Sequence, residues 1–343
     1  MSPRQVPRNW GARLTEALIQ GMRMVFLENE VLRVGVNLDR GTEIFQFCHK
    51  PTDLDLCPIA PWGVTDRDLP LHAPDPLSAF QDSYPGGWQE IFPNAGAPSS
   101  HRGASFGQHD EAWQTPFKLT VVRDDEAEVA VTMRAEMRRT PFTLEKQLRL
   151  RRGEAKLEVT GRVENLSPHP MEAMWGQHLA YGPPFLAPGC EVRLPDGIEA
   201  VPHPVATEAT GRRFSPDRFT WPLATGIDGG TVDLRRIPER GTRSDLCYLT
   251  GFGRDAWYEI LKPSGEGLRV EWDASTLPYL WYWQEFGAGS DYPWYGRLYT
   301  VGLEPSSSYP TNGLAEAVAN GTAMRLGPGE SRELHMNMEV RGA

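Results

Sequence analysis

The two residues with the clearest potential for chemistry are a histidine and a glutamate that lie far apart in the sequence. His178 lies in the aromatic, proline-containing segment 175–186, and Glu304 lies directly before Pro305 in the segment 301–310. An imidazole can give or take a proton near neutral pH, and a carboxylate can accept one. Aromatic faces can stack on the CH-rich faces of sugar rings and leave the polar ring substituents free. The two segments therefore contain the groups needed to move protons on a sugar.

Each of the two residues also has a purely structural interpretation. A lone histidine is often packed in a core and hydrogen-bonded to the backbone, and a glutamate at the end of a strand often faces water. We expect Glu304 to end an apolar strand over 299–303 and to be partly buried, with Pro305 fixing the turn that follows. Burial raises the pKa of a carboxyl group above its usual value of about 4.3 and makes the ionised form a stronger base.

The region 53–109 shows little alternation and many turn residues, which is typical of a functional loop inside a compact domain. We expect it to line a cleft and to supply Gln89, Asn94 and His109 as substrate-binding residues. On an extended chain His109 and Glu111 would face the same side, so that the pair could bind sugar hydroxyls. The same two residues could instead hold a metal, but the sequence offers no evident third ligand.

Weaker candidates for substrate contacts lie elsewhere in the chain. Gln177 and Asp245 could each bind a hydroxyl group, and Asp245 opens a predicted strand. Trp281 and Trp283 lie two positions apart, so one face of their strand carries two indoles, which form either core or a platform for a sugar. We expect Trp283 to contact the substrate. His203 has no neighbours that indicate a role, and we interpret it as structural.

The elements that must position these residues are almost all β-strands. Apolar and polar residues alternate in many short runs separated by turn residues, which indicates strands with one buried face. Consecutive strands joined by tight turns pair antiparallel, and so many strands exceed what one open sheet usually carries. The sequence therefore predicts an all-β fold, a large antiparallel β-sandwich. The predicted strands span 24–27, 32–38, 43–47, 117–122, 128–137, 142–150, 155–163, 246–250, 257–261, 267–273, 280–284, 298–303 and 332–339.

The domain organisation predicted from the sequence is simple. Residues 12–20 form the best helical candidate, and the period-two pattern begins after Arg23. No repeat of fixed period and no low-complexity linker divides the chain. We therefore expect one domain over 1–343 with a short N-terminal extension over 1–23.

Charge and cysteine usage limit the classes of partner and compartment. The chain has 343 residues and a net charge of −10 at pH 7, so nucleic acid and anionic membranes, which both require a basic face, are not expected partners. No apolar run approaches the roughly 20 residues of a membrane span or forms a signal-peptide core. The 4 cysteines show no CxxC spacing and are most simply reduced thiols, so we expect a cytoplasmic protein.

An ordered set of short motifs resembles the aldose 1-epimerase, or galactose mutarotase-like, family. The resemblance covers the chain from residue 24 to the end, and the segment 87–96 looks like a less characterised branch, because Ala95-Gly96 stands where family members usually carry Asn-Arg. The matching positions are, in order, 31–38, Gly41, 44–47, 50–53, 92–94, His109, 163–167, His178, 303–305 and 326–330.

The resemblance implies a concave sheet that holds a monosaccharide. It implies that Glu304 takes the proton from the anomeric hydroxyl while His178 protonates the ring oxygen. The ring then opens, the C1–C2 bond rotates, and the aldehyde recloses as the other anomer. By the same resemblance His109, and also Asp245, would hold hydroxyl groups. Ring opening needs an acid and a base on two oxygens of one anomeric centre, which suits this pair.

Three functions follow as hypotheses. The leading one is an aldose 1-epimerase-like isomerase that interconverts anomers, or epimers, of a free sugar or sugar derivative, with a small carbohydrate as its partner. The second is a carbohydrate-binding or sensing protein without catalysis. The third is a lyase or hydrolase acting on a glycoside or polysaccharide, for which the sequence shows no second carboxylate pair. We expect no cofactor, because no P-loop, dinucleotide or serine-hydrolase motif is present. The sequence indicates no oligomeric state.

Overall fold

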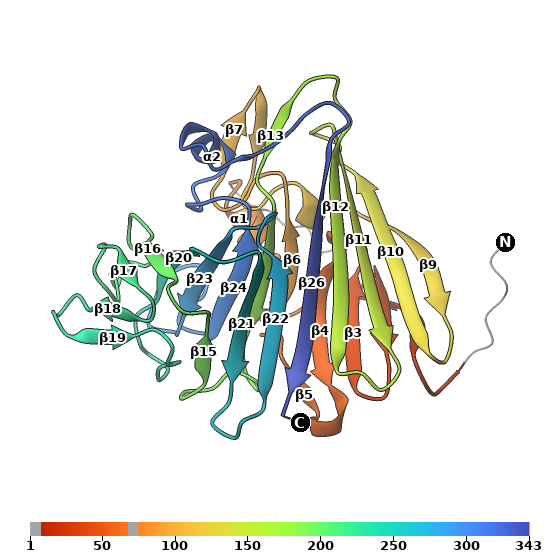
Figure 1. The fold of residues 1–343 in the computed structure, drawn as a ribbon, viewed down its shortest axis with the longest axis horizontal. Coiled ribbons are helices and arrows are strands. Elements are labelled where there is room, and N and C mark those ends of the chain that lie inside the picture. Colours follow the sequence, from red (N-terminus) through yellow and green to blue (C-terminus); the bar gives the residue numbers. More distant parts are fainter. Residues whose placement is uncertain (1–7, 68–74, 343) are drawn as a thin grey trace.

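Two large antiparallel sheets, packed face to face, form the body of the protein (Figure 1). The computed structural model describes residues 8–67 and 75–342. One sheet has 12 strands and the other has 8. The all-β sandwich expected from the sequence is therefore confirmed.

The strands of the two sheets come from the whole length of the described chain. In spatial order the 12-stranded sheet contains β1 (Arg13–Ile19), β2 (Met22–Glu28), β3 (Leu32–Asn37), β4 (Glu43–His49), β6 (Trp88–Ile91), β14 (Gly176–Tyr181), β24 (Thr300–Ser306), β23 (Tyr279–Glu285), β20 (Asp245–Thr250), β16 (Glu199–Pro202) and β17 (Phe219–Thr220), with β5 (Leu54–Asp55) paired to β4. The 8-stranded sheet contains β15 (Glu191–Arg193), β21 (Asp255–Leu261), β22 (Gly267–Asp273), β26 (Ser331–Arg341), β12 (Lys156–Asn165), β11 (Phe142–Arg151), β10 (Glu128–Glu136) and β9 (Lys118–Asp124).

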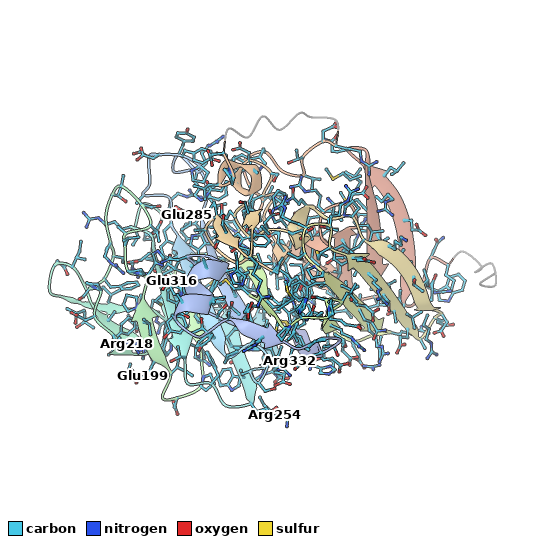
Figure 2. All side chains as sticks on the ribbon, turned by 90° about the horizontal axis from the view of Figure 1, so that it is seen from above. Glu199, Arg218, Arg254, Glu285, Glu316 and Arg332 are labelled. Atoms are coloured by element: carbon cyan, nitrogen blue, oxygen red, sulfur yellow. The ribbon has the colours of Figure 1, made fainter. Side chains whose placement is uncertain are left out.

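Smaller elements lie outside the two large sheets. The short strand pairs are β7 (Ser99–His101) with β8 (Ala104–Phe106), β13 (Met171–Ala173) with β25 (Met324–Leu326), and β18 (Leu223–Thr225) with β19 (Thr231–Asp233). The helical elements are the 3₁₀ turns η1 (Lys50–Thr52) and η2 (Ala112–Gln114) and the short helices α1 (Ser78–Gln81) and α2 (Leu314–Ala319). On the surface, Glu316 of α2 and Arg332 of β26 are exposed to solvent (Figure 2). No helix in the described ranges is long and apolar enough to cross a membrane.

The main apolar core lies between the two sheets. Val34 of β3 and Leu148 of β11 are fully buried in one continuous cluster of apolar side chains. Successive side chains of a strand point to opposite faces, so each strand contributes alternate residues to this layer. The burial along β11 follows that rule from Leu144 to Arg151, where buried positions alternate with half-buried ones. Each strand predicted from period-two alternation is present, with its ends shifted by a few residues. The four cysteines are free thiols, as expected.

The helix expected over residues 12–20 is wrong. Arg13–Ile19 is instead strand β1, which pairs with β2 along its whole length and forms one edge of the 12-stranded sheet. The connection consists of Gln20 and Gly21, both with positive φ. Two-residue turns of this kind match the twist of a hairpin, and pairing with β2 outweighs the moderate helical propensity of the segment. Much of the expected N-terminal extension thus belongs to the sheet.

Candidate active site

Strands β14 and β24 bring the histidine and the glutamate together. The two strands pair at Gly176↔Ser306 and again at Ala180↔Gly302, in one register. This register places His178 opposite Glu304, and directly opposed residues of an antiparallel pair project from the same face. The expectation that Glu304 ends its strand is wrong, because β24 continues to Ser306. Pro305 lies inside the strand, where it has no N–H to donate to a neighbour.

Both side chains lie at the wall of a cavity of about 630 Å³. His178 is 5% exposed and Glu304 is 3% exposed, and His178 Nε2 lies 3.8 Å from Glu304 Oε1. The Nδ1 atom of His178 is buried without a hydrogen-bond partner among the described residues. An imidazole and a carboxyl group therefore face the same enclosed space at a separation that one substrate oxygen could bridge.

Burial moves the pKa values of the two groups in opposite directions. It lowers the pKa of the His178 imidazole to about 4 and raises the pKa of the Glu304 carboxyl well above its usual value. Removal from water disfavours whichever form is charged, which explains both shifts. Burial thus favours the neutral form of each group, a protonated carboxyl for Glu304 and an uncharged imidazole for His178. One member can give a proton and the other can accept one.

Gly302 provides the space that the Glu304 carboxyl occupies. A Cβ atom at Gly302 would lie 2.3 Å from Glu304 Oε1 and 3.1 Å from Cε3 of Trp283. The carboxyl group thus folds back along its own strand over a residue without a side chain. Only glycine permits this position of the carboxyl, because a Cβ atom does not approach a non-bonded atom to within 3.0 Å.

We therefore expect Gly302→Ala to displace the Glu304 carboxyl from its place beside His178. The added methyl overlaps Oε1, so sugar isomerisation should fall by at least about tenfold, which corresponds to about 1.4 kcal/mol of transition-state stabilisation. Gly253→Ala is the matched control, since a Cβ there would meet nothing within 4 Å. The measurement is the exchange rate of both variants at equal concentration. Equal rates would contradict this role of Gly302.

His109 lies beside the pair, as expected. Its ring centre is 5.2 Å from that of His178, and its Nδ1 accepts a hydrogen bond from the backbone N–H of Gly96 at 3.0 Å. Burial lowers the pKa of His109 well below its usual value. A neutral imidazole whose Nδ1 accepts a hydrogen bond carries its proton on Nε2. His109 can therefore donate a hydrogen bond from Nε2.

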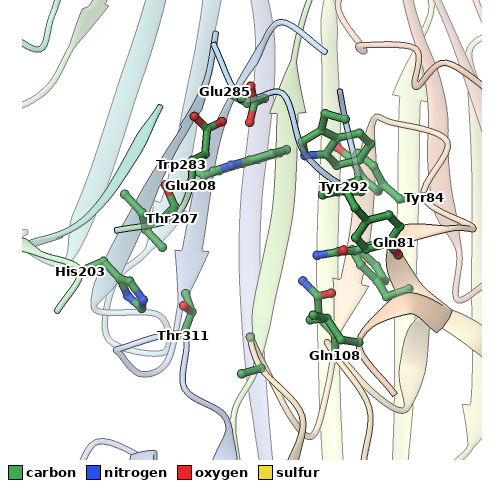
Figure 3. Close-up of a pocket in the computed structure, with 18 of the residues that line it drawn as sticks. Gln81, Tyr84, Gln108, His203, Thr207, Glu208, Trp283, Glu285, Tyr292 and Thr311 are labelled. Atoms are coloured by element: carbon green, nitrogen blue, oxygen red, sulfur yellow. The ribbon is translucent and has the colours of Figure 1, made fainter. Parts of the chain in front are cut away.

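His203, which the sequence analysis interpreted as structural, also lines the cavity (Figure 3). Its Nδ1 lies 2.5 Å from the hydroxyl of Tyr248, and that hydroxyl accepts a hydrogen bond from Thr311 N at 2.9 Å. Burial lowers the pKa of His203 to about 4. The Tyr248 hydroxyl also donates to Thr311 Oγ1 at 3.2 Å, so the tautomer of neutral His203 decides whether its Nε2 presents a donor or an acceptor to the cavity. No signal in the sequence distinguished this histidine, because the contacts that orient it come from distant strands.

Aromatic rings cover much of the remaining wall. Trp281 and Trp283 both line the cavity, so the two-indole face of β23 borders the cavity as well as the packed interior. The ring of Trp283 lies 5.7 Å from that of His178, and the ring of Tyr84 lies 5.4 Å from it. The Tyr84 hydroxyl is buried with no hydrogen-bond partner in the described ranges. Flat apolar surfaces with free polar edges suit the stacking of a sugar ring.

Two predicted binding residues of the loop region do not line the cavity. The side-chain amide of Asn94 is hydrogen-bonded to the backbone. It donates to Ala97 O and Gly107 O and accepts from Leu314 N. Gln89 lies beside His178 in the register but donates to Gly86 O at 2.7 Å. The loop itself does line the cavity, as expected, through Leu77, Phe80, Gln81, Tyr84, Gly96, Ala97, Gln108 and His109.

The expected His109–Glu111 pair does not form. The chain turns at His109, which has a φ of 55°, so the extended geometry assumed for the pair is absent. Glu111 instead accepts hydrogen bonds from the backbone N–H groups of Arg138 and Arg139 at 2.6 and 2.7 Å. Its carboxylate thus anchors a distant turn. No group of three or more metal-ligating side chains occurs within the part of the chain that the structure describes.

Gln177 and Asp245 also lie away from the cavity. Gln177 neighbours His178 on β14 and therefore points to the opposite face, where its Nε2 donates to Glu90 Oε1 at 2.6 Å. Asp245 is fully buried and accepts hydrogen bonds from the backbone N–H groups of Arg213 and Phe214. The side chains of Gln177 and Asp245 thus make contacts outside the cavity, on strands whose neighbouring residues line it.

Two glutamates missed by the sequence analysis line the cavity near Trp283. Glu208 lies in the irregular segment after β16, and Glu285 closes β23 (Figure 3). Burial, followed by a hydrogen bond with Glu208, raises the pKa of Glu285 to about 8. The alternation Trp281, Trp283, Glu285 could have identified Glu285 as a cavity residue, since positions two apart share a face. Glu208 carries no comparable signal.

Comparison with known proteins agrees with this architecture. A family described as a domain of unknown function (DUF4432) matches residues 19–220 and 255–340, and no curated protein matches. A candidate aldose 1-epimerase of Klebsiella pneumoniae is similar in structure, with a TM-score of 0.74, 14% identity and coverage of 96% of this chain and 87% of that one.

Two further structures have the same fold at comparably low identity. A galactose mutarotase-like protein of Clostridium acetobutylicum has a TM-score of 0.64 and 12% identity, covering 97% of this chain and 99% of that one. A candidate aldose 1-epimerase of Escherichia coli K12 has a TM-score of 0.59 and 15% identity, covering 96% and 100% of the two chains. At these identities the likeness establishes the galactose mutarotase-like fold and nothing finer.

Proposed function

The chain belongs to the DUF4432 family, and we propose that it is an isomerase that interconverts the anomers of a free sugar or sugar derivative by acid–base opening of the ring. The observation that carries the proposal is the buried pair of His178 and Glu304, whose Nε2 and Oε1 atoms lie 3.8 Å apart in the cavity. The mutarotase-like fold of the similar structures adds support, because their names point to the same chemistry.

The proposed reaction moves one proton onto the sugar and one off it. One member of the pair protonates the ring oxygen while the other takes the proton of the anomeric hydroxyl. The resemblance assigned the basic role to Glu304 and the acidic role to His178. Burial favours the opposite starting arrangement, in which Glu304 carries the proton and neutral His178 accepts one. Transfer of that one proton within the pair interconverts the two arrangements.

Neighbouring groups complete the proposed site. His109 offers an Nε2 donor to sugar hydroxyls, His203 offers its Nε2 as a second polar contact, and Trp283 supplies a stacking surface. The side chains come from positions between 77 and 312, which supports the proposal that the chain acts as one domain. We propose that Gln89, Asn94, Glu111, Gln177 and Asp245 act only behind this site, through the contacts described above.

A hydrolase on the same fold is less well supported, even though the structure shows a second carboxyl pair that the sequence did not reveal. The cavity does hold a second carboxyl pair, Glu208 and Glu285. These two groups hydrogen-bond to each other, whereas glycoside hydrolases keep their two carboxyl groups about 5 Å or more apart to admit the glycosidic bond. A binding protein without catalysis would not require an acid and a base whose reactive atoms lie 3.8 Å apart, as those of His178 and Glu304 do.

The test is the rate of anomer exchange of free aldoses, measured by NMR with and without the protein, as a function of pH. The cavity histidines stay neutral until the pH falls to about 4, because burial lowers the pKa values of His178 and His203 to about 4. No histidine of the cavity should therefore titrate between about pH 7 and about pH 5, whereas an ordinary histidine would titrate near 6.5. Absence of acceleration for every aldose, uronate and phosphosugar tested would refute the function, and a His178 ring that titrates near pH 6.5 by NMR would refute its neutral state in the site.

A further inference from the structure

The Glu208–Glu285 pair is an acidic site without a protein cation. Glu285 is 3% exposed, Glu208 is half-buried, and the two carboxyl groups hydrogen-bond to each other. Neither carboxyl forms an ion pair with a lysine or arginine among the described residues, and no lysine or arginine lines the cavity over those ranges. A buried carboxylate without a cationic partner is costly, and burial followed by the contact with Glu208 raises the pKa of Glu285 to about 8, which favours a protonated Glu285.

The Glu208–Glu285 pair lies about two residues along β23 from the His178–Glu304 pair. The Glu304 carboxyl folds over Gly302, and Gly302 pairs with Trp283 on β23. Glu285 follows Trp283 by two residues on the same face, which is about 7 Å along the strand. This separation places the carboxyl pair within reach of a sugar substituent on the side of the ring remote from its anomeric carbon.

Independent observations indicate that this cavity is completed by a polar ligand. The Tyr84 hydroxyl and His178 Nδ1 line the same cavity, and both are buried without a hydrogen-bond partner among the described residues. Figure 3 shows Tyr84 on the opposite side of the cavity from Glu208, and the Tyr84 ring centre lies 6.5 Å from that of Trp283. The Gly289 backbone packs closely against the Glu208 carboxyl, since a Cβ there would lie 2.7 Å from Glu208 Oε1. Buried polar atoms in native proteins are almost always paired, so a ligand is the natural partner.

We propose that Glu208 and Glu285 form a subsite for an ammonium group, so that the sugar bound in this cavity is an amino sugar. This inference rests on the proposed function. An ammonium group has three donors and can satisfy both carboxylates at once, which a single hydroxyl cannot do. The indole of Trp283 beside the pair would add a favourable contact between a cation and an aromatic face. Glu285 would release its proton to the solvent as the ammonium group binds.

The decisive experiment compares binding of matched sugars by calorimetry. The probes are D-glucose and D-galactose, their 2-, 3-, 4- and 6-amino-deoxy derivatives, and the N-acetylated form of each amine, which retains the shape but has no charge. At least one amine should bind on the order of tenfold or more tightly than both its parent sugar and its N-acetyl form. Binding in two buffers of different ionisation enthalpy should show release of a proton to the buffer.

Substitutions assign the preference to the pair. In Glu208→Gln, and in Glu208→Gln/Glu285→Gln, the advantage of the amine should fall to within about threefold of the parent sugar. Glu316→Gln on the exposed face of α2 is the matched control and should retain the full advantage. Glu208 is half-buried at the cavity wall, so the single variant tests the subsite even if Glu285 proves necessary for folding.

The outcomes separate the subsite from the chemistry. Amines that bind no more tightly than their parent sugars, or an advantage that persists without both carboxylates, would overturn the subsite. Preferential binding of an amine without anomer exchange would overturn the proposed isomerase and leave the subsite standing. Exchange of neutral sugars without a preference for amines would overturn the subsite and leave the proposed isomerase standing. Failure of every sugar to bind would overturn both.

Discussion

Replacing Glu304 by glutamine, or His178 by asparagine, should lower the acceleration of anomer exchange by about 10²- to 10⁴-fold. Each substitution removes one end of the proton transfer and leaves a side chain of similar size at the cavity wall. Oε1 of Glu304 and Nε2 of His178 lie 3.8 Å apart, so the two groups act on the same anomeric centre. The measurement is two-dimensional exchange NMR on an aldose that the wild-type protein converts.

The double variant distinguishes a cooperating pair from two separate contributions. Residues that act as a unit are strongly non-additive, so Glu304→Gln/His178→Asn should be little slower than either single variant. His335→Asn and Glu316→Gln carry the same chemical changes at exposed positions and serve as controls. Wild-type rates in both single variants, with folding preserved, would eliminate the pair as the source of catalysis.

Loss of Lys146 should destabilise the protein by about 3–5 kcal/mol, because it leaves a buried carboxylate without its cation. Lys146 on β11 is 1% exposed, and its Nζ lies 3.1 Å from Oε2 of Glu90 on β6. The same ammonium lies 4.1 Å from the centre of the Trp88 ring. The ion pair thus connects the two sheets through the core.

Lys146→Met tests this expectation by urea unfolding. The second variant, Lys146→Met/Glu90→Gln, removes both charges and should recover most of the lost stability, since replacing a whole buried pair by neutral groups is far less costly than breaking it. Lys156→Met, on a half-exposed side chain of β12, is the control and should change stability by less than about 1 kcal/mol. A loss below that value for Lys146→Met would show that the buried pair contributes little.

This ion pair also supports the proposed site from behind. Glu90 Oε1 accepts hydrogen bonds at 2.6 Å from Nε1 of Trp175 and Nε2 of Gln177, the residue before His178. The face of β14 opposite His178 is therefore held by a buried polar network. Gln177, expected to bind substrate, thus serves to hold the strand that carries His178.

Period-two alternation was sufficient to predict most of the fold. Strands β10, β11 and β12 were recognisable because one face of each is apolar and the turns between them contain glycine or charged residues. The error at β1 has a local cause. Its residues are half-buried or exposed at a sheet edge, so the apolar alternation that distinguishes a strand from a helix is weak.

The sequence by itself determined the sandwich and identified His178, Glu304 and His109, because their unusual aromatic, glycine- and proline-rich surroundings are local properties. Only the tertiary structure decided which side chains face the cavity. The register of β14 against β24 set His178 opposite Glu304, and the turn at His109 directed Glu111 away. The Glu208–Glu285 pair joins an irregular segment to a strand end, so no local pattern could reveal it. A side chain's direction along a strand follows from sequence, but its neighbours across the sheet depend on pairings between residues far apart in the chain.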